Sequence, residues 1–277
     1  MMVQPFGARL RAAMDERGPL CVGIDPHAAL LRGWGLDDDI DGLEAFTRTV
    51  VEALAGQVAV LKPQSAFFER FGSRGIAVLE RAVAEARAAG ALVIMDAKRG
   101  DIGSTMAGYA AAYVDENSPL ASDAVTVSPY LGYGSLRPVL DLAEEHGAGV
   151  FVLALTSNPE GSEVQRATAA DGTSVASVML RHIAAENANA PVLGSVGAVV
   201  GATLGDVGVD LDIHGPLLAP GIGAQGATPQ DIPTVFGDAA RNVVPSVSRE
   251  ILRHGPSHEA LREAARRYAD ECRAAIG

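Results

Sequence analysis

Eight short apolar segments recur along the 277-residue chain, and helical periodicity follows all but one of them. Apolar runs of this length are typical of strands buried on both faces, and helical connections between strands imply parallel pairing. The expected strands are residues 19–24, 58–61, 91–96, 124–127, 149–155, 191–196, 216–219 and 242–247. The expected helices between and after them are residues 42–55, 75–89, 104–114, 136–146, 175–187, 229–236 and 258–275. Eight strands in roughly 250 residues predict an α/β fold, a (β/α)8 barrel of the TIM type, rather than a doubly wound sheet.

The pattern continues without a break in composition, a linker or a low-complexity tract. We therefore expect a single domain over residues 1–277, in which an additional amphipathic helix at residues 6–17 covers one end of the barrel. The 48% hydrophobic content is sufficient for a sizeable core.

Charge and cysteine content restrict the partners and the compartment. A net charge of −12 argues against nucleic acid or an anionic membrane, and an anionic substrate would need a local cluster of donors. The N-terminus has no apolar core for a signal peptide, and the longest uncharged segment, residues 187–205, is apolar over too short a length to cross a bilayer. Cys21 and Cys272 have no spacing typical of a metal site or a disulfide framework, so we expect a soluble protein of the reducing cytoplasm.

The segment at residues 91–105, ALVIMDAKRGDIGST, joins an apolar strand to a dense group of charges. Side chains alternate along a strand, so Asp96 and Lys98 should point the same way, roughly 6.6 Å apart along it. Asp101 follows in the next turn. Of the 22 lysine and arginine residues only two are lysines, Lys62 and Lys98, and both lie at the end of an expected strand. Lysine retained among so many arginines indicates positions that need a compact ammonium with a tunable pKa.

Polar residues also lie at the carboxyl ends of other strands, where TIM-type barrels carry their chemistry. They are Asp25, Ser157, Gln225 and Arg249, and the glycines Gly221, Gly223 and Gly226 lie beside them. The glycines after the seventh strand offer backbone N–H groups that can approach a phosphate at the entrance of a helix. Gln225 adds an amide, and the Arg249 guanidinium is a planar fork that matches phosphate oxygens. The last two loops therefore predict a phosphorylated ligand.

The D-x-K-x-x-D-I-x-x-T run resembles the signature of the orotidine 5′-phosphate decarboxylase family, in particular its longer bacterial branch. Its residues are Asp96, Lys98, Asp101, Ile102 and Thr105. Further motifs follow in the family's order: Asp25 in GIDPH, Lys62 in LKPQSAFFERFG, Ser157 in TSNPEG, Gln225 in PGIGAQG and Arg249 in SVSREIL. The resemblance covers nearly the whole chain. Ala227 after the loop glycine and Glu250 after the arginine depart from the family pattern and bear on the details of phosphate binding.

The resemblance implies a cofactor-free enzyme that converts orotidine monophosphate to UMP and CO2 in pyrimidine synthesis. It also implies a homodimer in which Asp101, Ile102 and Thr105 reach into the partner's active site. Lys62, Asp96, Lys98 and Asp101 would form a network of alternating charges. The implied ligand contacts are Asp25 and the partner's Thr105 with ribose, Ser157 with the pyrimidine, and Gln225 and Arg249 with phosphate.

The charges of this network suit a decarboxylation on physical grounds. Two carboxylates interleaved with two ammoniums sum to zero, so each group can stay charged in a poorly hydrated pocket. A substrate carboxylate about 4 Å from Asp96 would be repelled by about 4 kcal/mol at an effective dielectric of about 20, and loss of CO2 removes that repulsion. The Lys98 ammonium can stabilise and protonate the carbanion left at C6 of the ring.

Other functions remain open on the sequence alone. Keto-gulonate phosphate decarboxylases and hexulose phosphate synthases are barrels that share D-x-K-x-x-D. The resemblance to them implies a metal-dependent enzyme with an acidic residue at the end of the second strand, where this chain has Lys62. A Schiff-base aldolase through Lys98 is disfavoured because flanking carboxylates hold the amine protonated. A binding protein for phosphorylated ligands would keep Gln225 and Arg249 but would not need both lysines.

Purely structural roles also remain open for single residues. Asp101 could cap the following helix, a role for which Ser104 competes. Asp25 before a proline could form a turn, and Ser157 could belong to ordinary loop structure. His27 has no predicted catalytic role and is expected to be a loop residue.

Overall fold

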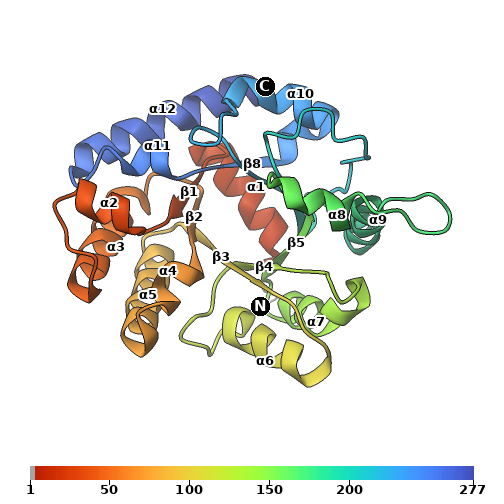
Figure 1. Ribbon diagram of the computed structural model, residues 1–277, viewed down its shortest axis with the longest axis horizontal. Coiled ribbons are helices and arrows are strands. Elements are labelled where there is room, and N and C mark those ends of the chain that lie inside the picture. The colour runs from red at the N-terminus through yellow and green to blue at the C-terminus, as the bar shows by residue number, and fades with distance from the viewer. Residues whose placement is uncertain (1–3) are drawn as a thin grey trace.

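Eight parallel strands close into a barrel, and helices surround it (Figure 1). The structure is a computed structural model and describes residues 4–277. The strands are β1 (Cys21–Ile24), β2 (Val60–Pro63), β3 (Leu92–Arg99), β4 (Ala124–Val127), β5 (Gly149–Leu155), β6 (Val196–Val200), β7 (Leu217–Pro220) and β8 (Val243–Val247). Each strand pairs with the next along the chain, and β8 pairs with β1. The predicted (β/α)8 fold is confirmed.

The helices include one at each end of the described chain and several short helices at the rim of the barrel. They are α1 (Phe6–Arg17), α2 (Ala28–Gly33), α3 (Ile40–Leu54), α4 (Ser65–Glu69), α5 (Gly72–Ala88), α6 (Gly103–Val114), α7 (Arg137–Glu145), α8 (Ser162–Gln165), α9 (Val175–Asn187), α10 (Ile232–Phe236), α11 (Arg249–Leu252) and α12 (His258–Ile276). Within residues 4–277, none of them has the length and apolar character needed to cross a membrane.

Helix α1 closes the N-terminal end of the barrel, as the sequence predicts. Figure 1 shows it across the middle of the ring of strands. Phe6 is fully buried and meets the Phe151 ring of β5 edge to face, with 5.9 Å between the ring centroids. Both rings belong to the apolar cluster that fills the barrel with inward-facing side chains such as Ile94. At the rim of this end, Arg9 Nη1 donates to Asp123 Oδ1 at 2.5 Å.

A second, larger apolar cluster lies between the outside of the barrel and the helices. It contains alternate strand residues such as Val22 and Ile24, together with helix residues such as Phe46 of α3. Cys21, adjacent to Val22, belongs instead to the interior cluster. This alternation follows from the period of two along a strand, and it separates the two cores.

The sixth strand lies further along the chain than the sequence predicts. The expected strand at residues 191–196 is wrong, because β6 begins at Val196 and a turn and loop precede it. Gly197 lies within β6 at a close contact, where a Cβ would lie 2.6 Å from a Phe151 ring carbon and 2.5 Å from the Pro216 carbonyl oxygen. Gly197, which follows the expected strand in the sequence, therefore allows β6 to approach its neighbours closely.

Replacing Gly197 with alanine should destabilise the barrel by about 1–3 kcal/mol, because the added methyl group overpacks this contact. Gly33→Ala is the matched control, because a Cβ at Gly33, at the exposed end of α2, meets no atom within 4 Å. The control should not lower stability, and it should raise it by up to about 1 kcal/mol because alanine is the better helix former. Urea unfolding followed by circular dichroism measures both variants, and equal stabilities would contradict the packing explanation.

Candidate active site

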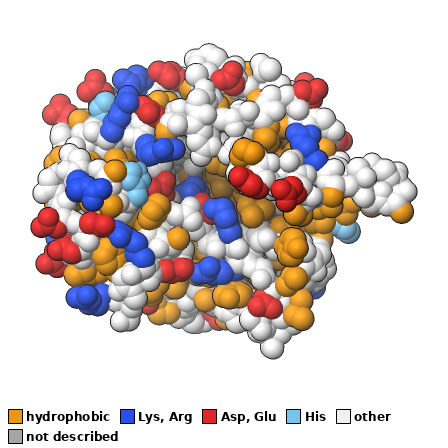
Figure 2. All heavy atoms as spheres, viewed as in Figure 1, with side chains coloured by type: hydrophobic (Ala, Val, Ile, Leu, Met, Phe, Trp, Pro, Cys, Tyr) orange, Lys and Arg blue, Asp and Glu red, His pale blue; other side chains and the backbone are white. Residues whose placement is uncertain are grey.

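A cavity of about 450 Å³ opens at the carboxyl ends of the strands, at the opposite end of the barrel from α1. Figure 2 shows the hollow, with Lys and Arg side chains beside it. Eight residues that the sequence singles out line it: Asp25, Lys62, Asp96, Lys98, Ser157, Gly221, Gln225 and Arg249. Because the barrel is closed, strand ends that are far apart in the sequence meet around one cavity.

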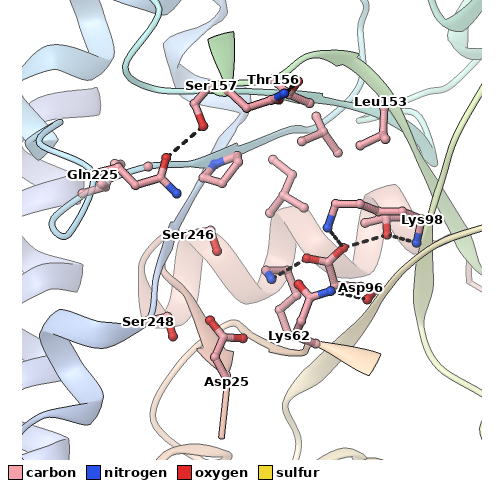
Figure 3. A pocket seen from close by; sticks show the side chains of 18 of the residues that line it. Asp25, Lys62, Asp96, Lys98, Leu153, Thr156, Ser157, Gln225, Ser246 and Ser248 are labelled. Atoms are coloured by element: carbon pink, nitrogen blue, oxygen red, sulfur yellow. Dashed lines mark hydrogen bonds and ion pairs between the residues drawn. The ribbon is translucent and has the colours of Figure 1, made fainter. Parts of the chain in front are cut away.

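Asp96 occupies the centre of the charged part of this cavity (Figure 3). Its Oδ2 accepts a hydrogen bond from Lys62 Nζ at 2.8 Å. Its Oδ1 accepts hydrogen bonds from Lys98 Nζ at 2.5 Å and from Thr126 Oγ1 at 2.9 Å. Asp96 and Lys62 are each 6% exposed, whereas the Lys98 side chain is 43% exposed. Of the two lysines, Lys98 is therefore the one whose ammonium a ligand can reach.

Backbone pairing between neighbouring strands holds these charges in place. Lys62 lies on β2 in register with Gly23 of β1, and Asp96 lies on β3. Gln64, which follows β2, forms an isolated bridge with Asp96, and its side-chain Nε2 donates to the Asp96 carbonyl oxygen at 3.0 Å. The lysine and the carboxylate are therefore fixed by the sheet rather than by a flexible loop.

The two buried groups stabilise each other's charged form. Burial opposes ionisation of Asp96, but the Lys62 and Lys98 ammoniums outweigh it and hold the pKa of the carboxyl far below its usual range. Burial also opposes the charge of Lys62, but the Asp96 and Asp25 carboxylates outweigh it and raise the pKa of the amine. Both groups therefore stay ionised at neutral pH.

The backbone at Lys98 departs from a regular strand. Lys98 has a φ of +49°, in the left-handed region, and the register between β3 and β4 shifts around it. The Thr126 hydroxyl of β4 accepts hydrogen bonds from the N–H groups of Ala97 and Lys98. The sequence does not single out Thr126, although the alternation of side chains along β4 could have placed it inside the barrel.

Two loops meet across another part of the cavity. Ser157 Oγ donates to Gln225 Oε1 at 2.8 Å and joins the loop after β5 to the loop after β7 (Figure 3). Gln165 of α8 anchors the backbone just before Ser157, because its amide exchanges two hydrogen bonds with Thr156. No pattern in the sequence distinguishes Gln165 from other polar loop residues.

Two of the glycines after β7, Gly223 and Gly226, differ from the sequence prediction that their N–H groups are free for a phosphate, whereas the Gly221 N–H has no backbone acceptor within residues 4–277. The Gly223 N–H donates to the Ala227 carbonyl, and the Gly226 N–H donates to the Gly223 carbonyl. These two amides therefore stabilise the loop itself. Ala224 and Gln225 also line the cavity, and their N–H groups have no backbone acceptor among residues 4–277. The N–H groups of Gly221 and Ile222, which also line the cavity, likewise have no backbone acceptor among these residues, so an anion could reach the amides of all four.

The two departures from the family pattern lie behind the loop rather than in the cavity lining. Ala227 accepts the Gly223 hydrogen bond at 2.7 Å and so closes the turn. Glu250 of α11 pairs with Arg253 at 2.8 Å. A Cβ at Gly223 would lie 2.5 Å from the Glu250 side chain, and the φ of Gly223 is +82°. Glycine is therefore required there on two counts.

Unpaired polar atoms lie near the ends of β1 and β8. Asp25 Oδ1 and Ser248 Oγ are buried and have no hydrogen-bond partner within residues 4–277, and both residues line the cavity. His27 has a structural role, because its Nδ1 accepts the Leu30 N–H at the start of α2. In the described part of the chain, no three His, Cys, Asp or Glu side chains are grouped so that they could hold a metal ion.

Asp101, Ile102 and Thr105 lie outside the cavity that this chain forms. Asp101 Oδ1 accepts the Ile102 N–H at 2.8 Å. Ile102 itself precedes α6 without a side-chain cap, so neither Asp101 nor Ser104 caps that helix. Ile102 is 63% exposed, and Tyr130 in the loop after β4 is 77% exposed. One chain therefore brings together three of the four predicted charges.

Comparison with known sequences connects this cavity to a family. The model of the orotidine 5′-phosphate decarboxylase / HUMPS family matches residues 18–264. A Streptomyces coelicolor protein named orotidine 5′-phosphate decarboxylase is 72% identical over 275 residues, which cover 99% of each chain. A Salinispora arenicola protein of the same name is 62% identical over 275 residues, again with 99% of each chain covered.

Solved structures agree with the sequence comparison. A Streptomyces avermitilis protein provisionally called orotidine 5′-phosphate decarboxylase has a TM-score of 0.98 and 72% identity, with 100% of this chain and 97% of that one covered. The orotidine monophosphate decarboxylase of Leishmania donovani has a TM-score of 0.79 and 29% identity, with 99% of both chains covered. The chain described here therefore belongs to the orotidine 5′-phosphate decarboxylase / HUMPS family.

Proposed function

We propose that the chain is an orotidine 5′-phosphate decarboxylase, a carboxy-lyase that converts orotidine monophosphate to UMP and CO2 in de novo pyrimidine biosynthesis without a cofactor. Relatives that are 72% and 62% identical carry that name. The observation that carries the proposal is the ionised Asp96 carboxylate between the Lys62 and Lys98 ammoniums, in a cavity of a size typical for small ligands. The cytoplasm is the compartment we propose for it.

In the proposed reaction, the substrate carboxylate lies against Asp96. The like charges repel by about 4 kcal/mol at about 4 Å and an effective dielectric of about 20. The bond from C6 to the carboxylate breaks, CO2 leaves and the bonding electron pair stays on C6. The Lys98 ammonium stabilises this carbanion and donates a proton to C6, and the neutral amine regains a proton from water. Lys62 keeps Asp96 ionised throughout.

The remaining cavity residues would bind the nucleotide away from the reacting carbon. Arg249 and the Gln225 side chain hold the phosphate, together with the free N–H groups of Ala224 and Gln225. Asp25, which has an unpaired oxygen, accepts a ribose hydroxyl, and Ser157 contacts the pyrimidine. Binding energy from these remote groups orients the ring over Asp96 and Lys98.

The proposal includes a homodimer in which Asp101, Ile102 and Thr105 complete the partner's site. Within residues 4–277, the only acidic group paired with Lys98 is Asp96, so Lys98 has room for a second carboxylate. Asp101 of the partner subunit would supply it. Burial of the exposed Ile102 side chain at an interface would also remove apolar surface from water.

The main alternative is a metal-dependent sugar-phosphate enzyme with the same D-x-K-x-x-D run. Such an enzyme needs an acid at the end of β2, where this chain has Lys62. Both oxygens of Asp96 accept hydrogen bonds from ammonium groups, which oppose a cation at that carboxylate. These contacts favour the decarboxylase.

Chelator-treated wild-type protein should convert orotidine monophosphate to UMP and CO2 as fast as untreated protein, because no proposed step uses a metal ion. The measurement is UMP formation followed by absorbance, with and without EDTA. Activity that EDTA abolishes and Mg²⁺ restores would favour the alternative. The absence of UMP formation under both conditions would overturn the proposed activity.

Mixing two inactive variants tests the shared site. Lys98→Ala and Asp101→Ala should each be inactive alone, because each homodimer lacks one charge in both sites. A hybrid dimer has one site with both charges intact, so an equal mixture should recover about a quarter of the wild-type activity after random exchange. Turnover is measured after the subunits are mixed and dimers verified by mass. Verified hybrids without activity would contradict a crossing Asp101.

A further inference from the structure

We infer that Thr126 is a positioning residue that holds Asp96 and Lys98 in their working geometry, an inference that rests on the proposed roles of those two residues. Thr126 lies on β4, is 1% exposed and lines the cavity next to the charged pair. Its hydroxyl is neutral and buried, so it does not supply charge to a ligand. Its effect is instead on the geometry of β3.

The Thr126 hydroxyl uses its full hydrogen-bonding capacity on three consecutive residues of β3. It donates to Asp96 Oδ1 at 2.9 Å. It accepts from the Ala97 N–H at 3.1 Å and from the Lys98 N–H at 3.0 Å. A hydroxyl has one proton and two lone pairs, so no capacity is left for another partner.

The register of the two strands explains why a side chain is needed here. Met95 of β3 pairs with Val125, and Arg99 pairs with Val127. Three residues of β3 therefore face one residue of β4, which is Thr126. Its backbone cannot pair with all three, and its hydroxyl contacts each of them instead. Irregular pairing of this kind often redirects a side chain at an active site.

The hydrogen bonds of Thr126 have to maintain an unfavourable backbone conformation at Lys98. Its φ of +49° is unfavourable for a residue with a Cβ and persists only when the surroundings stabilise it. The Lys98 N–H bond to Thr126 is one such restraint, and the Nζ contact with Asp96 at 2.5 Å is another. Loss of the hydroxyl removes the backbone restraint and one of the hydrogen bonds to Asp96. The ammonium and the carboxylate then lose their fixed separation.

Thr126→Val tests this directly, because valine keeps the size and branching of threonine and removes only the hydrogen bonds. We expect kcat for orotidine monophosphate to fall by about 100-fold, as displaced reacting groups typically cause. The dissociation constant for UMP should change little, because the proposed phosphate and ribose contacts lie elsewhere. Thr126→Ser keeps the hydroxyl and should recover most of the lost kcat.

Thr47→Val is the matched control. Thr47 of α3 is also 1% exposed, but its hydroxyl has no partner within residues 4–277 and it does not line the cavity. This variant should keep the wild-type kcat. If Thr126→Val does not fold, Thr126→Ser and Thr126→Ala form a second pair that differs by the hydroxyl alone, and the alanine variant should show the loss.

A crystal structure of Thr126→Val, or of Thr126→Ala if valine prevents folding, provides a readout that does not depend on the proposed reaction. We expect Lys98 to leave the left-handed region and its Nζ to move away from Asp96. The inference is overturned if Lys98 keeps its conformation, if kcat is unchanged, or if the serine variant is as impaired as the variants without a hydroxyl. A parallel loss of UMP affinity and kcat would also overturn it, because that pattern indicates a general structural role.

Discussion

A carboxylate buried between two ammonium groups is the interaction on which this site depends. An unpaired charge buried as deeply as Asp96 would cost several kcal/mol to desolvate. Lys62 and Lys98 offset that cost with hydrogen bonds to opposite oxygens of the carboxylate. Lys62 comes from β2 and Asp96 from β3, so correct pairing of these two strands is a condition for the site to exist.

The two ends of the barrel differ in a way that strengthens this interaction. Helix α1 fills the N-terminal end with apolar side chains, and the cavity lies at the carboxyl ends of the strands. Water therefore reaches Asp96 and its two lysines from the cavity. The low dielectric of the apolar interior beneath them strengthens both the attraction between these charges and the repulsion of a further carboxylate. A carboxylate placed over Asp96 would meet a fixed charge that cannot relax away, which is the arrangement that electrostatic catalysis requires.

The barrel and most of its rim follow from the sequence, because each apolar run ends in a recognisable break and the lysines are so rare. The sequence does not predict the contacts between segments that are far apart in the chain. The place of Gly197 inside β6 depends on the Phe151 ring beside it. Thr126 has no distinguishing pattern until its three-to-one register with β3 is seen. The sequence predicts the Gly223 N–H as a donor, but it does not predict that the acceptor is the Ala227 carbonyl of the same loop. The role proposed for Asp101 requires a second chain, and the sequence suggests it only through the family resemblance.

The ionisation state of Asp96 is the most direct measurement of this electrostatic arrangement. Carbon-13 NMR of labelled aspartate carboxyls, with the Asp96 signal assigned by its loss in Asp96→Asn, reports it as a function of pH. Folding lowers the pKa of Asp96 from about 3.9, so its contribution to stability is fully present above about pH 5 and is lost progressively as the pH falls from there through the folded pKa. We expect an ionised carboxylate from pH 4 to 9. Proton uptake by Asp96 between pH 4 and 7 in the wild-type protein would contradict it.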